Sequence, residues 1–250
     1  MMRSRVQDVT FDDGPYPRGR IGFVCVANAG LTEGEMIRMC PPDVGLSFTH
    51  MRTRTDISIE SLAQMEHDID DALSGFVPGR NDIDVLCYNC TSGSVVIGEK
   101  IIREKLEAGR PNVKGTTLLT GVVAALRALG IKNLSVGTAY TPDIDELERV
   151  YLENQGFSVG LIEGLCLTED VKMNLVSPGF LRDFAISLDR PDADAIFLSC
   201  GALRSLEVVE DVEQKIGKPV LGSNQASLWH CLRLAGINDR IEGYGRLLRS

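Results

Sequence analysis

Short apolar runs alternate with amphipathic segments along the whole chain. The apolar runs predict strands at 20–26, 45–51, 83–88, 134–139, 157–162, 194–199 and 219–222. Between them, apolar residues with helical spacing predict helices at 57–75, 95–107, 120–129, 143–155, 178–189, 205–216 and 226–235. Strands and helices that alternate in this way are typical of parallel sheets covered by helices. The predicted fold class is therefore α/β.

Two of the predicted strands end in the same way. In DIDVLCYNCTSGS, Cys90 follows Asp84 by six residues, and in ADAIFLSCGALRS, Cys200 follows Asp194 by six. Each cysteine is followed by a helix, a short strand and a similar segment, ALRALGI in the first case and CLRLAGI in the second. The separation is 110 residues for the cysteines and 106 for the segments. Two copies of one α/β unit, related by a pseudo-two-fold axis, explain this repeat.

The repeat predicts that both thiols face one ligand. Ligands of α/β sheets bind at the loops that follow the strands, so matching loops of two related units can face one another across a cleft. Small residues follow each cysteine, namely Thr91, Ser92, Gly93 and Ser94 after the first and Gly201 and Ala202 after the second. With helices starting just beyond, their N–H groups are expected to bind carboxylate oxygens and to lower the thiol pKa. The alternative is that two strands merely end in buried cysteines, which are common in cores, but the pairing favours a site.

Composition and charge exclude several classes of partner. The 250 residues allow one large domain or two of roughly 110 to 130 residues. The net charge is −9, and no basic run is interleaved with aromatic residues, which argues against nucleic acid and anionic membrane as partners. The apolar runs are shorter than the ~18 residues of a membrane span. The N-terminus lacks the apolar region of a signal peptide, so we expect a cytoplasmic protein.

The seven cysteines also suggest other chemistries. An odd number without a secretory signal favours reduced thiols over a disulfide framework. We expect Cys25, Cys166 and Cys231, which lie in apolar patterns, to be small buried hydrophobes. Cys87 and Cys90 form a C-x-x-C, which suggests a redox pair or half of a metal site, although Cys87 lies inside the apolar run. The three histidines offer no second pair of zinc ligands, and the motifs of dinucleotide, P-loop and serine-hydrolase sites are missing from the sequence.

Four blocks resemble one known group of enzymes. These are NCTSGS with Cys90, GTAY ending at Tyr140, SCGALRS with Cys200, and PVLGSNQASLW from Pro219 to Trp229. They are similar to the maleate cis-trans isomerases and arylmalonate decarboxylases of the aspartate/glutamate racemase superfamily, in the same order along the chain. The similarity extends from about Ile21 to Ile237. Proteins of ectoine-utilisation clusters also resemble maleate isomerases, and the chain could be one of them.

The resemblance implies two Rossmann-like parallel-sheet domains with the active site at their interface and no cofactor. With the repeat, it places one lobe at 1–113 plus 226–250 and the other at 114–225. It implies a homodimer or homotetramer that acts on a small carboxylate. The residues it implies for the site are Cys90 and Cys200 as the catalytic pair, with Asn28, Thr91, Ser92, Tyr140, Asp170, Gly201 and Ala202 at the substrate. Decarboxylases of the group have glycine in place of the first thiol, which favours an isomerase here.

The expected reaction is cis-trans isomerisation of maleate or a close dicarboxylate analogue to fumarate. The Cys90 thiolate adds to one alkene carbon, the carboxylate takes the charge as an enediolate, and Cys200 donates or shuttles a proton. Isomerases of the group have asparagine near Asp170, and an acidic group there would repel a second carboxylate. A two-thiol racemase or epimerase of amino acids or hydantoins is the main alternative. An arylmalonate-type decarboxylase and a non-catalytic two-lobe binding protein are further alternatives.

Overall fold

The computed structural model describes residues 9–52, 56–76 and 82–250. Residues 1–8, 53–55 and 77–81 lie outside the described residues. The first of these segments is the start of the N-terminus that was predicted to be non-secretory, and of the first predicted lobe. Within the described part of the chain, no helix has the length and apolar character needed to cross a membrane.

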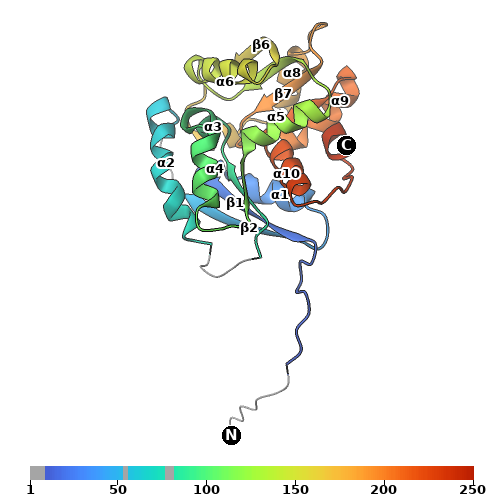
Figure 1. Cartoon of the computed structure of the whole chain (residues 1–250). Coiled ribbons are helices and arrows are strands. Elements are labelled where there is room, and N and C mark those ends of the chain that lie inside the picture. Colours follow the sequence, from blue (N-terminus) through green and yellow to red (C-terminus); the bar gives the residue numbers. More distant parts are fainter. Residues whose placement is uncertain (1–8, 53–55, 77–81) are drawn as a thin grey trace.

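The chain forms two four-stranded parallel sheets (Figure 1). The first has the order β2-β1-β3-β4 and consists of β1 (Gly19–Val26), β2 (Val44–Met51), β3 (Val85–Asn89) and β4 (Lys114–Thr117). The second has the order β6-β5-β7-β8 and consists of β5 (Asn133–Thr138), β6 (Ser158–Gly164), β7 (Ala195–Ser199) and β8 (Val220–Gly222). Because the two orders correspond strand for strand, the predicted α/β class and the internal repeat are confirmed.

Helices follow nearly every strand. In the first half they are η1 (Ala27–Ala29), α1 (Thr32–Met39), α2 (Ile59–Leu73), α3 (Thr91–Ile97), α4 (Glu99–Glu107) and α5 (Leu118–Ala128). In the second half they are α6 (Pro142–Asn154), α7 (Asp170–Asn174), α8 (Pro178–Ser187), η2 (Ser205–Glu207), α9 (Val209–Ile216), α10 (Ser223–Leu234) and α11 (Gly245–Leu248). Figure 1 shows α2 and α4 beside the first sheet and α6 and α8 beside the second.

Two predicted helices are divided differently in the structure. The helix predicted at 95–107 is two helices that meet at Gly98, whose φ of 95° ends α3 and starts α4 in a new direction. The helix predicted at 205–216 begins as the 3-10 turn η2, and regular α-helix starts only at Val209. As a result, Cys90 directly precedes a helix, as expected, whereas Cys200 is followed by a turn.

The last strand of the first sheet lies beyond residue 113, where the first lobe was predicted to end. Strand β4 starts at Lys114 and pairs in parallel with β3, so the first sheet extends to Thr117. Helix α10 starts at Ser223, three residues before the predicted return at 226, and packs on α1 and β3 of the first lobe as well as on α5.

The two aspartates of the repeat have a structural role. Asp84 accepts a hydrogen bond from the backbone N–H of Arg20, at 2.8 Å, and so joins the start of β3 to the start of β1. Asp194 accepts from the N–H groups of Lys132 and Asn133, at 3.0 and 2.8 Å, at the matching place in the second sheet. These hydrogen bonds hold the pKa of Asp194 below its usual value. Each carboxylate therefore fixes the strand that carries a thiol at its other end.

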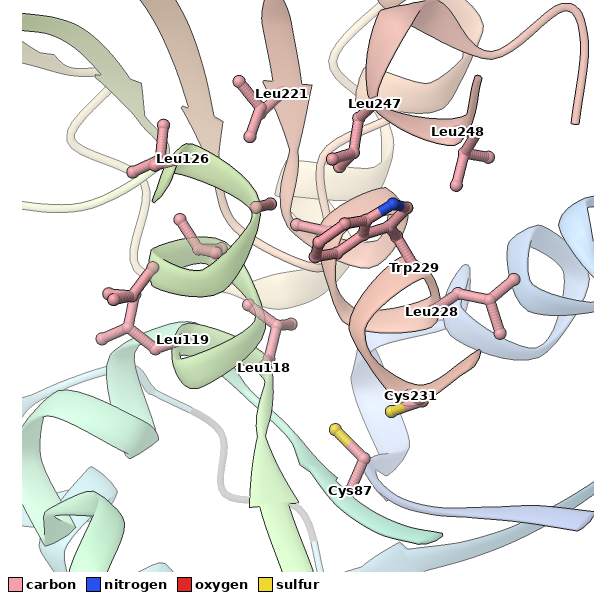
Figure 2. Packing of buried hydrophobic residues seen from close by; sticks show 14 of the residues in the cluster. Cys87, Leu118, Leu119, Leu126, Leu221, Leu228, Trp229, Cys231, Leu247 and Leu248 are labelled. Carbon is pink, nitrogen blue, oxygen red and sulfur yellow. The ribbon is translucent and has the colours of Figure 1, made fainter. Parts of the chain in front are cut away.

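Helices α5 and α10 hold the two halves together. Figure 2 shows their leucines and Trp229 packed against one another and against Leu221 of β8. At Gly121 of α5, an added Cβ would lie 3.1 Å from the carbonyl oxygen of Ala226 and 3.2 Å from the Cβ of His230. Glycine therefore lets the two helices approach closely, whereas a Cβ would require the neighbouring helix to shift by a few tenths of an ångström. The two helices are the counterparts of one another in the repeat.

The cysteine predictions are confirmed in part. Cys25 and Cys231 are buried hydrophobes of the core, as expected. Cys166 is exposed, so that prediction was wrong. The chain leaves the edge strand β6 at Gly164, and a left-handed φ of 55° at Cys166 turns its side chain outward.

Candidate active site

Cys90 ends β3 and caps the next helix. Its Sγ accepts a hydrogen bond from the backbone N–H of Gly93, at 3.3 Å, as the N-cap of α3, and lies 3.8 Å from the Ser92 hydroxyl. The side chain is half-buried, so the thiol can be reached from the pocket that it lines together with Ser92 and Asp170.

Cys200 ends β7 in a strained conformation. Its φ of 144° lies in the region that favours glycine, at a cost of about 1–3 kcal/mol. The backbone is held there by a hydrogen bond from Cys200 N–H to Ser223 Oγ, at 3.0 Å. The Sγ accepts from Ala202 N–H at 3.3 Å and lies 3.6 Å from the sulfur of Met173. Strain that the surrounding structure maintains is typical of functional sites.

Each thiol lies beside a buried tyrosine hydroxyl. Tyr140 donates to the sulfur of Cys200, and Tyr88 lies next to the sulfur of Cys90. A Cβ on Gly93 would be 2.3 Å from Tyr88 Oη and 3.1 Å from Cys90 Sγ, so glycine is required where the hydroxyl and the thiol meet. The Tyr88 hydroxyl forms no hydrogen bond with any other residue in the described part of the chain.

Burial keeps both thiols protonated in the free protein. Desolvation raises the pKa of Cys90 to about 11. Hydrogen bonds from the N–H of Gly93 and from the hydroxyls of Ser92 and Tyr88 act in the opposite direction and lower this pKa. Desolvation and the charge of Asp170 raise the pKa of Cys200 to about 12, although Tyr140 and Ala202 N–H lower it. The expected effect of the N–H groups is present, but burial outweighs it. Charge on Cys90 also raises the pKa of Cys200.

The start of α10 ties the two thiol loops to each other. Ser223 Oγ accepts from Cys200 N–H and lies 3.1 Å from the hydroxyl of Thr91. If Ser223 donates to Thr91, the Thr91 hydroxyl keeps its own proton for a ligand. Beside it, the Asn224 amide donates to the carbonyl of Gly201 at 2.9 Å, and its oxygen accepts from the Asn89 amide at 2.9 Å. This network fixes the position of one thiol relative to the other.

Asp170 and Asn28 lie on neighbouring elements. Asp170 is the first residue of α7 and lines the pocket of Cys90. Asn28 lies in η1, just after the carboxyl end of β1, and its carbonyl accepts from the amide of Asn174 at 3.4 Å. Of the expected site residues, Cys90, Ser92 and Asp170 line this pocket, and the charge of Asp170 raises the pKa of both thiols. The others do not line it, namely Asn28, Thr91, Tyr140, Cys200, Gly201 and Ala202.

The C-x-x-C cysteines do not form a redox pair. The sulfur of Cys87 lies 3.3 Å from Ser227 Oγ and points toward Cys231 (Figure 2). Cys90, by contrast, lines the pocket. In the described residues, no group of three or more metal-ligating side chains could hold a metal ion.

The comparisons with known proteins agree with this geometry. A sequence model of the family described as arylmalonate decarboxylase matches residues 90–248, which include both thiols. The chain belongs to this family. The arylmalonate decarboxylase of Bordetella bronchiseptica is 36% identical over 135 residues, a match that covers 53% of this chain and 56% of that enzyme.

Maleate isomerases are similar over nearly the whole chain. That of Nocardia farcinica is 28% identical over 242 residues, 92% of this chain and 95% of that enzyme. A solved structure of the Nocardia farcinica maleate cis-trans isomerase, a cysteine-to-serine mutant with a covalently bound succinylcysteine intermediate, has a TM-score of 0.81. That structure is 26% identical to this chain and covers 92% of it and 98% of the isomerase chain. The chain is thus an enzyme of the maleate isomerase and arylmalonate decarboxylase group, with their two-domain fold.

Sequence reasoning missed several residues of this family member's site. Tyr88 reads as one more residue of an apolar strand, and Met173 lies in a segment for which the sequence predicts no helix or strand. Ser223 and Asn224 stand in a block that carried the resemblance, but they are more than 100 residues from Thr91 and Asn89. The two tyrosines share one feature: each lies beside a thiol at the end of a strand, Tyr88 beside Cys90 and Tyr140 beside Cys200.

Replacing Tyr88 with phenylalanine is expected to slow alkylation of Cys90. The hydroxyl stabilises the thiolate, and a hydrogen bond to a charged group contributes about 1.5–3 kcal/mol, so we expect roughly a tenfold slower reaction with iodoacetamide. Peptide mass spectrometry between pH 7 and 10 measures the rate. In the wild type it rises about tenfold per pH unit without a plateau, because the thiol pKa is about 11. Tyr151→Phe, which removes a buried hydroxyl outside the pocket, serves as control; equal rates for Tyr88→Phe and wild type would contradict this role.

Replacing Ser223 with alanine is expected to loosen the Cys200 loop. The variant loses about 1–3 kcal/mol of stability, because Cys200 N–H stays buried without an acceptor. Turnover falls by about tenfold as the thiols lose their fixed spacing. Hydrogen exchange at Cys200 N–H and calorimetry measure the effect. Ser177→Ala, which removes the cap of α8, should cost stability without changing turnover; unchanged exchange at Cys200 would refute the positioning role of Ser223.

Proposed function

We propose that the chain catalyses cofactor-independent cis-trans isomerisation of maleate, or of a close analogue with a cis-alkene next to a carboxylate. The observation that carries this proposal is the pair of thiols from matching loops, held close together by Ser223 and each beside a tyrosine hydroxyl. The covalent succinylcysteine in the Nocardia farcinica isomerase supports addition of a cysteine to the substrate.

The carboxylate next to the alkene binds the donors of the two loops. These are the hydroxyls of Thr91 and Ser92 and the backbone N–H groups around Gly201 and Ala202. As the sulfur of Cys90 bonds to one alkene carbon, the electron pair of the double bond moves into this carboxylate as an enediolate, which the same donors stabilise.

Proton transfer completes the addition without a net gain or loss of protons. Cys200 gives its thiol proton to the other alkene carbon, and the proton of Cys90 passes to Cys200. The adduct is a saturated thioether, so its carbon-carbon single bond rotates. Cys200 then delivers its proton back toward Cys90 as it removes a carbon-bound proton, the carbon-sulfur bond breaks, and the trans-alkene leaves. Because both thiols are protonated at neutral pH, each step pairs a deprotonation with a bond that forms or breaks.

Two-thiol racemisation is the second candidate. One thiolate would remove an α-proton and the other thiol would deliver one from the opposite side, and two thiols from opposing loops suit this reaction equally well. Decarboxylation of an arylmalonate is supported by the 36% identity to the Bordetella enzyme. Neither alternative forms a covalent adduct on Cys90, and this difference separates them from isomerisation.

A substrate panel tests the proposal. The wild-type protein is incubated with maleate, the monoamide of maleate, single enantiomers of amino acids and hydantoins, and phenylmalonate. We expect a trans-alkene from at least one cis-butenedioic compound. Interconversion of enantiomers, or release of carbon dioxide, with no trans-alkene product would overturn the isomerase proposal.

A further inference from the structure

Asp170 occupies a central place in the site. Its side chain lines the pocket together with Cys90 and Ser92. Its charge raises the pKa of both Cys90 and Cys200. A ligand whose carboxylate binds the loops of the two cysteines therefore presents its other end to Asp170.

The carboxylate of Asp170 lacks a partner in the described part of the chain. Residues 9–52, 56–76 and 82–250 form no hydrogen bond and no ion pair with this carboxylate. Burial alone raises its pKa to about 6, so at neutral pH it is a charged, partly desolvated acceptor. A buried acceptor without a donor costs free energy, which a ligand recovers if it brings N–H groups.

The surroundings of Asp170 do not favour a second anion. The pocket lining includes apolar residues, among them Val26, Leu62 and Met65, and a second acidic residue, Asp56. Arg52 also lines the pocket, but its side chain is 82% exposed and lies 3.8 Å from the carboxylate of Asp71. A second carboxylate on the substrate would thus meet a like charge in a partly desolvated place, where repulsion is strong.

We propose that Asp170 makes the site specific for a cis-alkenoic acid whose far end carries N–H donors, a primary amide or an ammonium group, and discriminates against a second carboxylate. This inference rests on the proposed isomerase function and names its substrate class. An amide or ammonium donates directly to the Asp170 carboxylate, whereas the carboxylate of maleate has no proton to donate.

Three substrates and three proteins test the proposal. Isomerisation of maleate, its monoamide and cis-4-aminobut-2-enoate is measured with wild type, Asp170→Asn and Glu169→Gln. Glu169 is the matched control, because it neighbours Asp170 but pairs with Lys172 and does not line the pocket. The monoamide and the ammonium compound distinguish the two possible N–H donors.

The expected result is a reversal of preference. In the wild type, kcat/KM for the better N–H compound exceeds that for maleate by roughly 10- to 100-fold. In Asp170→Asn the ratio falls below one, because the asparagine amide donates to the second carboxylate, and in Glu169→Gln it stays at the wild-type value. Faster turnover of maleate by the wild type, with the same ratio in Asp170→Asn, would overturn the role of Asp170 and leave the isomerase standing.

A binding measurement separates this inference from the function. If no compound is isomerised by any of the three proteins, the proposed function fails. Protection of Cys90 from iodoacetamide still reports the relative affinities. Stronger protection by an N–H compound than by maleate, lost in Asp170→Asn, would support the recognition by Asp170. Equal protection in both proteins would overturn it.

Discussion

Replacing Cys90 with alanine is expected to abolish turnover, with a decrease in kcat of about 10⁴-fold or more. In the proposed mechanism the sulfur of Cys90 is the atom that bonds to the substrate. Among the described thiols Cys90 alone lines the pocket, Cys200 is assigned the proton transfers, and Cys87 points toward Cys231 in the core. Stability should change little, since the side chain is half-buried and its main contact is the cap to Gly93 N–H. Kinetics and calorimetry on the same preparation measure both effects.

An exposed cysteine provides the control for this variant. Cys166→Ala removes an exposed thiol that does not line the pocket and should retain full activity. Retention of even a tenth of the wild-type kcat by Cys90→Ala would show that the reaction does not pass through a covalent bond to this sulfur.

Replacing Cys200 with alanine is expected to stop the reaction at the covalent stage. In this variant water can protonate the basic enediolate carbon and complete the addition, whereas elimination requires the Cys200 sulfur to accept a weakly acidic carbon-bound proton. The adduct on Cys90 therefore accumulates, and kcat falls by about 10³-fold. Intact-protein mass spectrometry should show a mass increase of one substrate molecule, and peptide mapping should place it on Cys90. The double variant Cys90→Ala/Cys200→Ala should show no increase.

Two other outcomes for Cys200→Ala would change the mechanism. Full turnover without adduct would remove Cys200 from the proton transfers. Loss of turnover with no adduct, in a protein that still binds the substrate, would indicate that water cannot replace Cys200 as the proton donor in addition. The alanine keeps the strained φ of 144°, so the loop conformation is tested separately by hydrogen exchange at residue 200.

The sequence predicts the frame of this site because the frame follows from local patterns. The apolar runs and the repeat of Asp84 and Cys90 in Asp194 and Cys200 are visible in one dimension, and they place both thiols at strand ends. Helix α1 was missed because its apolar residues are few and its segment begins near a glycine-containing turn. Residues 95–107 were predicted as one helix because the sequence does not reveal that Gly98 has a positive φ.

The chemistry of the thiols depends on distances that a sequence does not contain. Neighbouring N–H groups predict a lower pKa for Cys90, but its value follows from how much water the fold excludes. The role of Ser223 follows from contact with Thr91 across 132 positions of the chain. Asp170, by contrast, was identified as a site residue from the resemblance, and its lack of a partner is visible only in the structure.

Proton NMR of the alkene signals tests the central claim most directly. Wild type, Cys90→Ala and Cys200→Ala are each incubated in D₂O with maleate and with its monoamide, and cis and trans alkene protons are followed over time. The account predicts a trans product from wild type alone, with deuterium at one alkene carbon because Cys200 exchanges its proton with solvent. A trans product from Cys90→Ala, or exchange of protons by wild type without any trans product, would contradict covalent isomerisation by this pair of thiols.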